Sequence, residues 1–164
     1  MPETLAASRN ELHSSTFLVE REFALREIGL IDEDIPHSYG EDYDWLLRAA
    51  RVTPLVAVRQ PLVRIRWQYS YFAQSWAKTI EGLRYQLGRM PELSERPRNL
   101  ARIYGRMAFA HAAVGDRREA RAWARRSLAL DRQQPRGYLA YLVSYGLVRP
   151  GTVQRLAYRV GRGI

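Results

Sequence analysis

From residue 71 to its end, the sequence follows a helical pattern that proline and glycine residues divide into segments. The segments predicted to be helical are residues 71–89, 98–114, 116–130, 135–147 and 152–158. Gly115 is placed to end the second of these segments. Asp116 and Glu119 form a capping-box pattern at the start of the third. The C-terminal part of the chain is therefore expected to be all-helical.

The N-terminal part mixes short apolar runs with helical segments. The runs at residues 16–19, 55–58 and 62–67 are β-prone and predict strands, whereas residues 20–28 and 42–51 predict helices, the first ended by Gly29. Two or three strands make a poor sheet alone, because an edge that should pair stays open. The predicted fold class is α+β and mostly helical, with a small, incomplete α/β piece before the helical tail.

Charge is divided unequally along the chain. Residues 1–50 carry 11 Asp and Glu against four Arg, whereas residues 51–164 carry six Asp and Glu against 22 Lys and Arg. The formal net charge of the whole chain is +9. All basic residues except Lys78 are arginine, which suits bidentate contacts to phosphate or carboxylate. Codon bias is the plainer reason for the choice of arginine, but it does not explain the asymmetry.

Composition excludes several classes of protein. The chain has no cysteine, which excludes disulfides, thiolate metal sites and a cysteine nucleophile. No apolar run has the length of a membrane span, and the first 30 residues lack the order of a signal peptide. A cytoplasmic location is expected. Arginines interleave with apolar residues at 148–164, which fits either binding to an anionic inner membrane face or a solvated terminal helix.

Four pieces of residues 14–72 carry a family pattern. They read STFLVER at 15–21, IGLIDE at 28–33, GEDYDWLLR at 40–48 and PLVRIRW at 61–67. In this order they resemble the C-terminal, acceptor-side part of the catalytic domain of family-two glycosyltransferases, which have the GT-A fold. The resemblance divides the chain into an acceptor-side portion, residues 1–72, and a helical tail, residues 73–164.

The resemblance implies transfer of a sugar from a nucleotide donor to an acceptor hydroxyl, with inversion. Such chemistry needs a base for the acceptor proton and stabilisation of the diphosphate leaving group. By this resemblance Asp42 is the catalytic base, and Glu41 is its neighbour or substitute. The alternative is that Asp42 only caps the helix that follows it.

The same resemblance gives roles to four further residues. Asp44 and Trp45 would bind the acceptor, but Asp44 is also four residues from Arg48 and suits a helical ion pair. Trp45 suits the core equally well. Arg64 and Arg66 would face the same side of a strand and bind the diphosphate. Their alternative is a solvated face.

The chain also departs from the family pattern. The family's metal-binding Asp-x-Asp has no counterpart, because the text matches at residues 32–34 and 42–44 lie in pieces matched to later elements. The complete enzyme is expected to use Mg²⁺ or Mn²⁺, for which this chain offers no ligand, and Gln68 stands near a common family histidine. The nucleotide-sugar half is missing as well. A longer polypeptide or a partner chain would have to supply it, and this chain alone is not expected to be active.

Residues 101–134 show a tetratricopeptide-like pattern, a 34-residue helix pair. Its packing positions are Tyr104, Met107, Ala108, His111, Ala120, Ala124, Ser127, Leu128 and Leu130. A second copy from residue 135 is partial. The alternatives are an ordinary helical hairpin and a non-catalytic protein-interaction module. Nonspecific binding of RNA or acidic lipid ranks last, because no nucleic-acid motif accompanies the basic charge.

Overall fold

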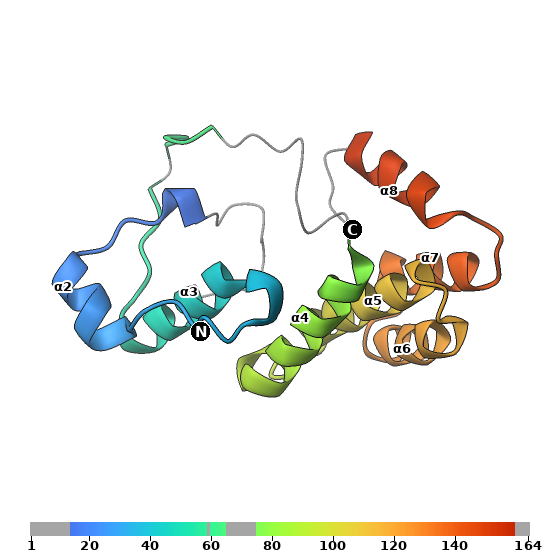
Figure 1. Ribbon diagram of the computed structural model, residues 1–164, viewed down its shortest axis with the longest axis horizontal. Helices are drawn as coiled ribbons and strands as arrows, with labels where there is room; N and C mark the ends of the chain where they lie inside the picture. The colour runs from blue at the N-terminus through green and yellow to red at the C-terminus, as the bar shows by residue number, and fades with distance from the viewer. Residues whose placement is uncertain (1–13, 59, 65–74, 160–164) are drawn as a thin grey trace. The chain divides into compact units, whose positions relative to one another are not determined.

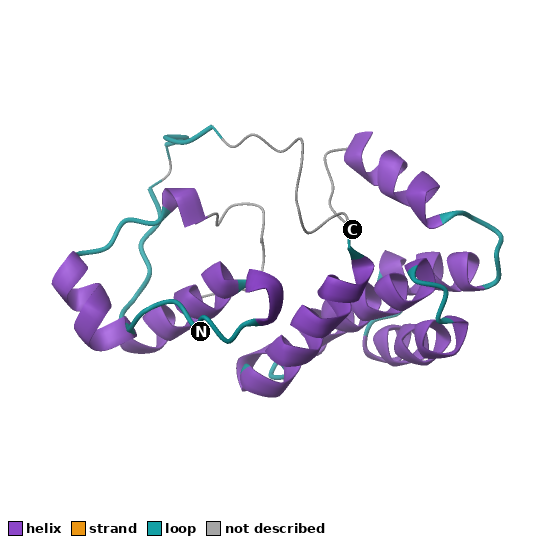
Figure 2. Ribbon diagram, viewed as in Figure 1, coloured by secondary structure: helices purple, strands orange, loops and turns teal. Residues whose placement is uncertain are grey.

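All regular elements among the described residues are helices (Figure 2), and no strand occurs there. The computed structural model describes residues 14–58, 60–64 and 75–159. The chain divides into two compact units, Met1–Ser70 and Tyr71–Ile164. The predicted α+β class, with its GT-A piece of two or three strands, is therefore wrong.

The first unit is built around two helical segments. Helix α2, Arg21–Phe23, continues directly into a π-helical turn, Ala24–Ile28. Gly29 ends it with a φ of 85°, a left-handed value that glycine adopts without strain. Helix α3 covers Glu41–Val52 (Figure 1). Both helices predicted in this part of the chain are confirmed. Short 3₁₀ turns lie at Ser14–Thr16 and Pro36–Ser38.

The predicted strands do not form. Residues 17–19 are irregular and Leu18 is 99% exposed, while residues 55–58 are irregular and Val56 is 92% exposed. Residues 62–64 are irregular too, and residues 65–67 lie outside the described residues. A β-prone run becomes a strand only beside another strand that pairs its backbone and covers its apolar face. Neither condition is met for these runs within the described chain.

The absence of strands among the described residues also overturns the resemblance to family-two glycosyltransferases. By the resemblance, two of its four pieces, at 15–21 and 61–67, correspond to strands of a GT-A sheet. The described residues of both are 3₁₀, irregular or helical. What remains is a turn and a helix, which many unrelated folds contain.

The core of the first unit is small. The buried apolar residues are Ile28, Ile35, Tyr39, Leu46, Leu47 and Ala49. Three of them come from one face of α3. The rest come from the end of the π-helical turn and the loop that leads to α3. Unit 1 is thus α3 with the preceding chain packed along it.

The second unit is a succession of helices. They are α4, Trp76–Arg89; α5, Pro97–Ala113; α6, Arg117–Leu130; α7, Pro135–Ser144; and α8, Pro150–Arg159, with a 3₁₀ turn at Pro91–Leu93 (Figure 1). All five predicted helices are confirmed, although residues 71–74 of the first lie outside the described residues. Three of the helices begin at proline, whose fixed φ and missing N–H suit the first turn.

The α5–α6 turn follows the sequence signals closely. Gly115 has a φ of 88°, and the Asp116 amide donates to the His111 carbonyl at 2.9 Å, which closes α5 in a Schellman-type motif. Asp116 then caps α6, because its Oδ1 accepts from the Glu119 amide at 3.2 Å. Helices α5 and α6 therefore form a helical hairpin.

Small residues bring the helices of the second unit close together. A Cβ added to Gly137 of α7 would lie 2.8 Å from Leu128 Cγ of α6. Ser127 of α6 donates its hydroxyl to the Ala101 carbonyl of α5 at 2.7 Å. Helix α7 packs against both α5 and α6, and α4 packs against α5.

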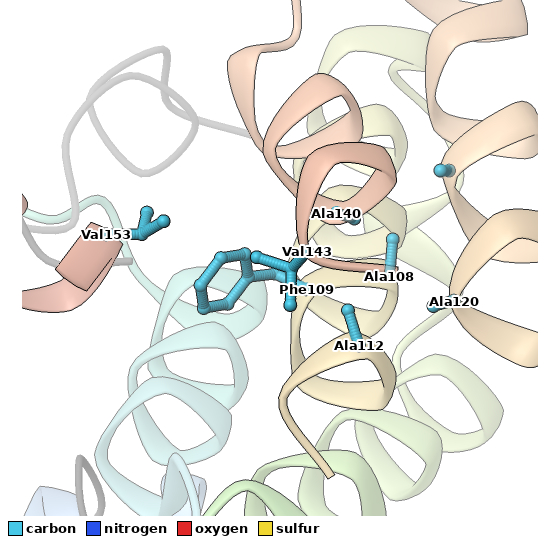
Figure 3. Close-up of a cluster of buried hydrophobic side chains, with 8 residues drawn as sticks. Ala108, Phe109, Ala112, Ala120, Ala140, Val143 and Val153 are labelled. Carbon is cyan, nitrogen blue, oxygen red and sulfur yellow. The ribbon is translucent and has the colours of Figure 1, made fainter. Parts of the chain in front are cut away.

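Helices α5 to α8 share one buried cluster (Figure 3). It consists of Ala108, Phe109, Ala112, Ala120, Ala124, Ala140, Val143 and Val153. Phe109 is the largest of these side chains, and its ring extends from α5 toward Val153 of α8. None of the helices in the described residues is long and apolar enough to cross a bilayer.

Candidate functional site

The N-terminus of α3 carries the two acidic residues that the sequence singles out as catalytic. Gly40, with a φ of 81°, precedes the helix, and Glu41 and Asp42 occupy its first turn. Asp42 Oδ1 accepts a hydrogen bond from the Tyr43 amide at 2.8 Å. Both carboxyls are half-buried. A carboxylate in this first turn is favoured by the helix dipole, so its position alone has a structural reason.

The surroundings of Glu41 change the pKa of its carboxyl group. Burial raises its pKa above the ordinary value of 4.5, and the negative charge of Asp42 beside it raises it further. Backbone hydrogen bonds to the carboxylate oppose both effects. Burial is the largest cause, because removing a carboxylate from water disfavours its charged form.

Asp44 has a structural role in this arrangement. Its carboxylate is buried and accepts from Arg48 Nε at 2.9 Å, one turn further along α3. The same guanidinium donates to the Ile28 carbonyl at 2.7 Å and to the Leu30 carbonyl at 2.8 Å. The ion pair therefore holds the end of the π-helical turn against α3.

Trp45 contributes to the same attachment. Its indole N–H donates to the Gly29 carbonyl at 3.0 Å, between the two carbonyls that Arg48 binds. Its ring stacks on Phe17 with 6.1 Å between centroids. Trp45, which is half-buried, therefore helps to hold the end of the π-helical turn and Phe17 against α3.

The structure does not assemble the remaining predicted residues into a site. Arg64 is exposed and has no polar partner in the described part of the chain, and Arg66 lies outside it. Among the described residues no three His, Asp or Glu side chains gather as a metal site would require. Asp42, Glu41, Asp44 and Trp45 thus share one helix, three of them with contacts that explain them structurally.

The second unit contains a buried histidine that sequence reasoning treated only as a packing position. His111 Nδ1 lies 3.2 Å from Asp116 Oδ2, which links the last turn of α5 to the cap of α6. Its Nε2 is buried and has no hydrogen-bond partner among the described residues. The pair joins the two helices at their turn.

A surface of arginines is the main chemical feature of the second unit. Eight exposed arginines have guanidinium groups that make no ion pair, hydrogen bond or ring contact with other described residues: Arg84, Arg96, Arg98, Arg117, Arg118, Arg125, Arg132 and Arg149. Three other arginines lie over aromatic rings: Arg126 over Trp123 at 4.6 Å, Arg121 over Tyr145 at 5.3 Å and Arg89 over Tyr85 at 5.8 Å. The charge asymmetry of the sequence predicts this surface; the individual positions depend on helix packing.

Apolar side chains are exposed beside these arginines. Tyr138 and Leu142 of α7 and Tyr145, which directly follows α7, lie one turn apart and are exposed. Their spacing places them on one face of the helix, opposite the buried residues Gly137, Ala140 and Ser144. The second unit therefore combines positive charge with accessible aromatic rings, a combination typical of surfaces that bind other molecules.

Comparison of this chain with protein-family models, with curated proteins and with solved structures finds no match.

Proposed function

We propose that the second unit is a protein-interaction module that binds an acidic segment of a partner protein. The observation that carries this proposal is the set of exposed arginines without carboxylate partners in the described residues. In a folded protein, surface cations are commonly balanced by nearby acidic groups. Here residues 71–164 contain 18 Lys and Arg against six Asp and Glu, so the surface favours an acidic ligand.

The helical architecture supports a binding module. Helices α5, α6 and α7 pack together in sequence order, and a proline begins α7 34 residues after the start of the tetratricopeptide-like pattern at residue 101. Stacked helix pairs present extended surfaces on which a partner segment can lie. The close approach of α6 and α7 at Gly137 fixes the arginines of α6 in a stable framework.

Sugar transfer stays an untested prediction and is not part of this proposal. It rested on a resemblance that the absence of strands among the described residues overturns. Of the five described residues assigned to it, Asp44 and Trp45 are engaged in holding the end of the π-helical turn.

A binding experiment tests the proposed function directly. The probe is a fluorescein-labelled peptide of about 18 residues that contains glutamate, alanine and leucine in amphipathic helical spacing. We expect it to bind the full chain in low salt and to lose affinity steeply between about 50 and 300 mM salt, because contacts between exposed charges are screened. Failure to bind at low salt would overturn the proposal.

A pair of charge variants locates the binding surface. Arg118→Gln with Arg125→Gln removes two exposed charges from α6, and Arg21→Gln with Arg26→Gln removes two exposed charges from the first unit. Exposed ion pairs contribute about 0.2–1 kcal/mol each, so loss of two such contacts should make the α6 variant bind roughly two- to thirtyfold more weakly. The control should bind like the unchanged chain, and equal effects would contradict the proposal.

A competition experiment separates a protein partner from other anions. Unlabelled single-stranded RNA and phosphatidylserine vesicles are added at matched charge concentration. A protein-interaction module should release the peptide only at much higher concentrations of either competitor. If RNA or vesicles compete as well as unlabelled peptide does, the surface is a general polyanion site and the proposal is wrong.

A further inference from the structure

Helix α8 is attached to the second unit through few contacts. Among the α8 residues whose side chains are described, Val153 is the one buried residue, with 7% of its surface exposed. Leu156, one turn later, is 56% exposed. Arg155 donates only to Thr152 Oγ1 of the same helix, at 3.4 Å. No ion pair joins α8 to α4, α5, α6 or α7 within the described residues.

The surface under Val153 is apolar. Val153 shares a buried cluster with Phe109 of α5 and Val143 of α7, and Trp76 of α4 and Val148 of the α7–α8 linker pack against that cluster. Trp76 meets the Phe109 ring edge-on, with 5.3 Å between centroids. Figure 3 shows Val153 facing the Phe109 ring, with Val143 beside it. We call these four residues, Trp76, Phe109, Val143 and Val148, the α8-binding face.

The end of α7 is complete without α8. The Gly146 amide donates to the Val143 carbonyl at 2.9 Å, and the Leu147 amide donates to the Leu142 carbonyl at 3.0 Å. With Gly146 at a φ of 77°, these bonds form a Schellman-type cap. Because the cap lies before Pro150, α8 can leave its place while the hydrogen bonds that end α7 remain.

Charge works against α8 in its present position. The helix contains two arginines and no acidic residue, and Arg149 precedes it directly. It therefore brings positive charge to a unit that already has an excess of it. Like charges repel one another, so an acidic helix with the same apolar anchor would be favoured on the same surface.

We propose that the α8-binding face is the docking site for an acidic amphipathic helix of a partner protein, and that α8 occupies this site until the partner displaces it. The inference rests on the proposed function and adds an apolar anchor site for the acidic partner segment. A single aliphatic anchor, exposed Leu156, the independent cap of α7 and the adverse charge all favour exchange of the bound helix. A helix already seated there shows that the face accepts one.

A matched pair of variants tests this proposal in the full chain. Val153→Asp places a charge at the buried anchor and should release α8. Leu156→Asp adds the same charge to the same helix at an exposed position and should leave α8 in place. The labelled probe copies residues 148–164 with Arg149→Glu, Arg155→Glu, Arg159→Glu and Arg162→Glu, and a second probe also carries Val153→Asp in the peptide.

We expect the acidic probe to bind the Val153→Asp chain about tenfold more tightly than it binds the Leu156→Asp or unchanged chain. The second probe, in which the peptide carries Val153→Asp, should bind the unchanged chain and both variants equally weakly. Circular dichroism and thermal unfolding check that each variant is folded. We expect both variants to be folded, because both substitutions lie in α8.

The outcomes separate this proposal from the proposed function. If the acidic probe binds all three chains with one affinity, α8 does not compete for the site and the inference is wrong, while the interaction module stands. If the valine-free probe binds as tightly as its parent, recognition is by charge alone, which also overturns the inference. If neither this probe nor the glutamate–alanine–leucine peptide binds any chain, the proposed function fails with it.

Discussion

Ser127 of α6 and Ala101 of α5 are joined by a hydrogen bond of 2.7 Å between the serine hydroxyl and the alanine carbonyl. Both residues are completely buried. The bond lies beside Gly105 of α5, whose added Cβ would lie 3.3 Å from Ser127 Oγ. It fixes the register of α6 on α5.

Replacing that serine should weaken the second unit measurably. Ser127→Ala removes a buried hydrogen bond between helices, and such a loss typically costs about 0.5–1.5 kcal/mol of unfolding free energy. Ser144→Ala is the matched control, because Ser144 is equally buried but donates to Tyr141 within its own helix. Urea unfolding should show a larger loss for Ser127→Ala. Equal losses would mean that the interhelical bond contributes nothing.

Substitution by alanine should lower the stability of the chain at Gly137 and raise it at Gly88. Gly137→Ala introduces a Cβ at 2.8 Å from Leu128 Cγ, and such overpacking costs about 1–3 kcal/mol when neighbours must shift. Gly88→Ala in α4 meets nothing within 4 Å and should stabilise by about 0.5–1 kcal/mol through helix propensity. Thermal unfolding measures both. A stabilised Gly137→Ala would show that α6 and α7 are not held in close contact.

The ion pair between Asp44 and Arg48 should stabilise the first unit. Arg48→Ala removes hydrogen bonds to the Ile28 and Leu30 carbonyls and leaves the buried Asp44 carboxylate without its cation. Hydrogen bonds to charged groups contribute about 1.5–3 kcal/mol, so we expect a loss of about 2–3 kcal/mol in the unfolding free energy.

The control for Arg48 is an exposed pair in the same unit. Arg26 lies 3.5 Å from Glu22, and both side chains are well exposed. Arg26→Ala should cost no more than about 0.5 kcal/mol, because exposed pairs are screened by water. Urea unfolding of the full chain, followed by circular dichroism, compares the two variants. A loss as large for Arg26→Ala as for Arg48→Ala would contradict this assignment.

Stability of the first unit should depend on the protonation of Glu41. Its pKa is raised in the folded state by burial and by Asp42, so the folded chain binds this proton more tightly than the unfolded chain does. Protonation of Glu41 therefore contributes favourably to the free energy of unfolding when the pH is below its ordinary pKa of 4.5. It is lost as pH rises from that value through the raised folded pKa.

Two variants check this dependence. Glu41→Gln should remove the decline of the unfolding midpoint over that pH range and leave a slightly more stable unit at neutral pH. Asp42→Asn should reduce the decline, because it removes the neighbouring charge and keeps an acceptor for the Tyr43 amide. Urea midpoints measured at intervals of half a pH unit decide the matter. An unchanged profile for Glu41→Gln would refute the effect of burial.

The helices could be predicted from the sequence because their signals are local. Periodicity, the prolines that begin α5, α7 and α8, and glycines such as Gly115 act within a few residues. The Asp44–Arg48 pair is similarly local, since its members are one helical turn apart. The contact of Asp116 with Glu119 follows from capping chemistry alone.

The strands and the binding surface could not be predicted in this way. Val56 and Leu18 sit in β-prone runs, but strand formation depends on a partner strand, which no local pattern supplies. The seating of Val153 against Phe109 depends on how α8 returns to α5 after the linker. The sequence marked residues 148–164 as basic and amphipathic without indicating what the apolar side contacts.

The most direct test of the account measures the position of α8 when an acidic helix binds. The chain has no cysteine, so Val114→Cys and Leu156→Cys place two spin labels at exposed positions near the end of α5 and on α8. Double electron–electron resonance then gives the distance between the labels without and with the acidic probe. We predict one narrow distance for the free chain and a longer, broader distribution at saturating probe. A distribution unchanged by bound probe would contradict the account, because α8 would then not occupy the partner's site.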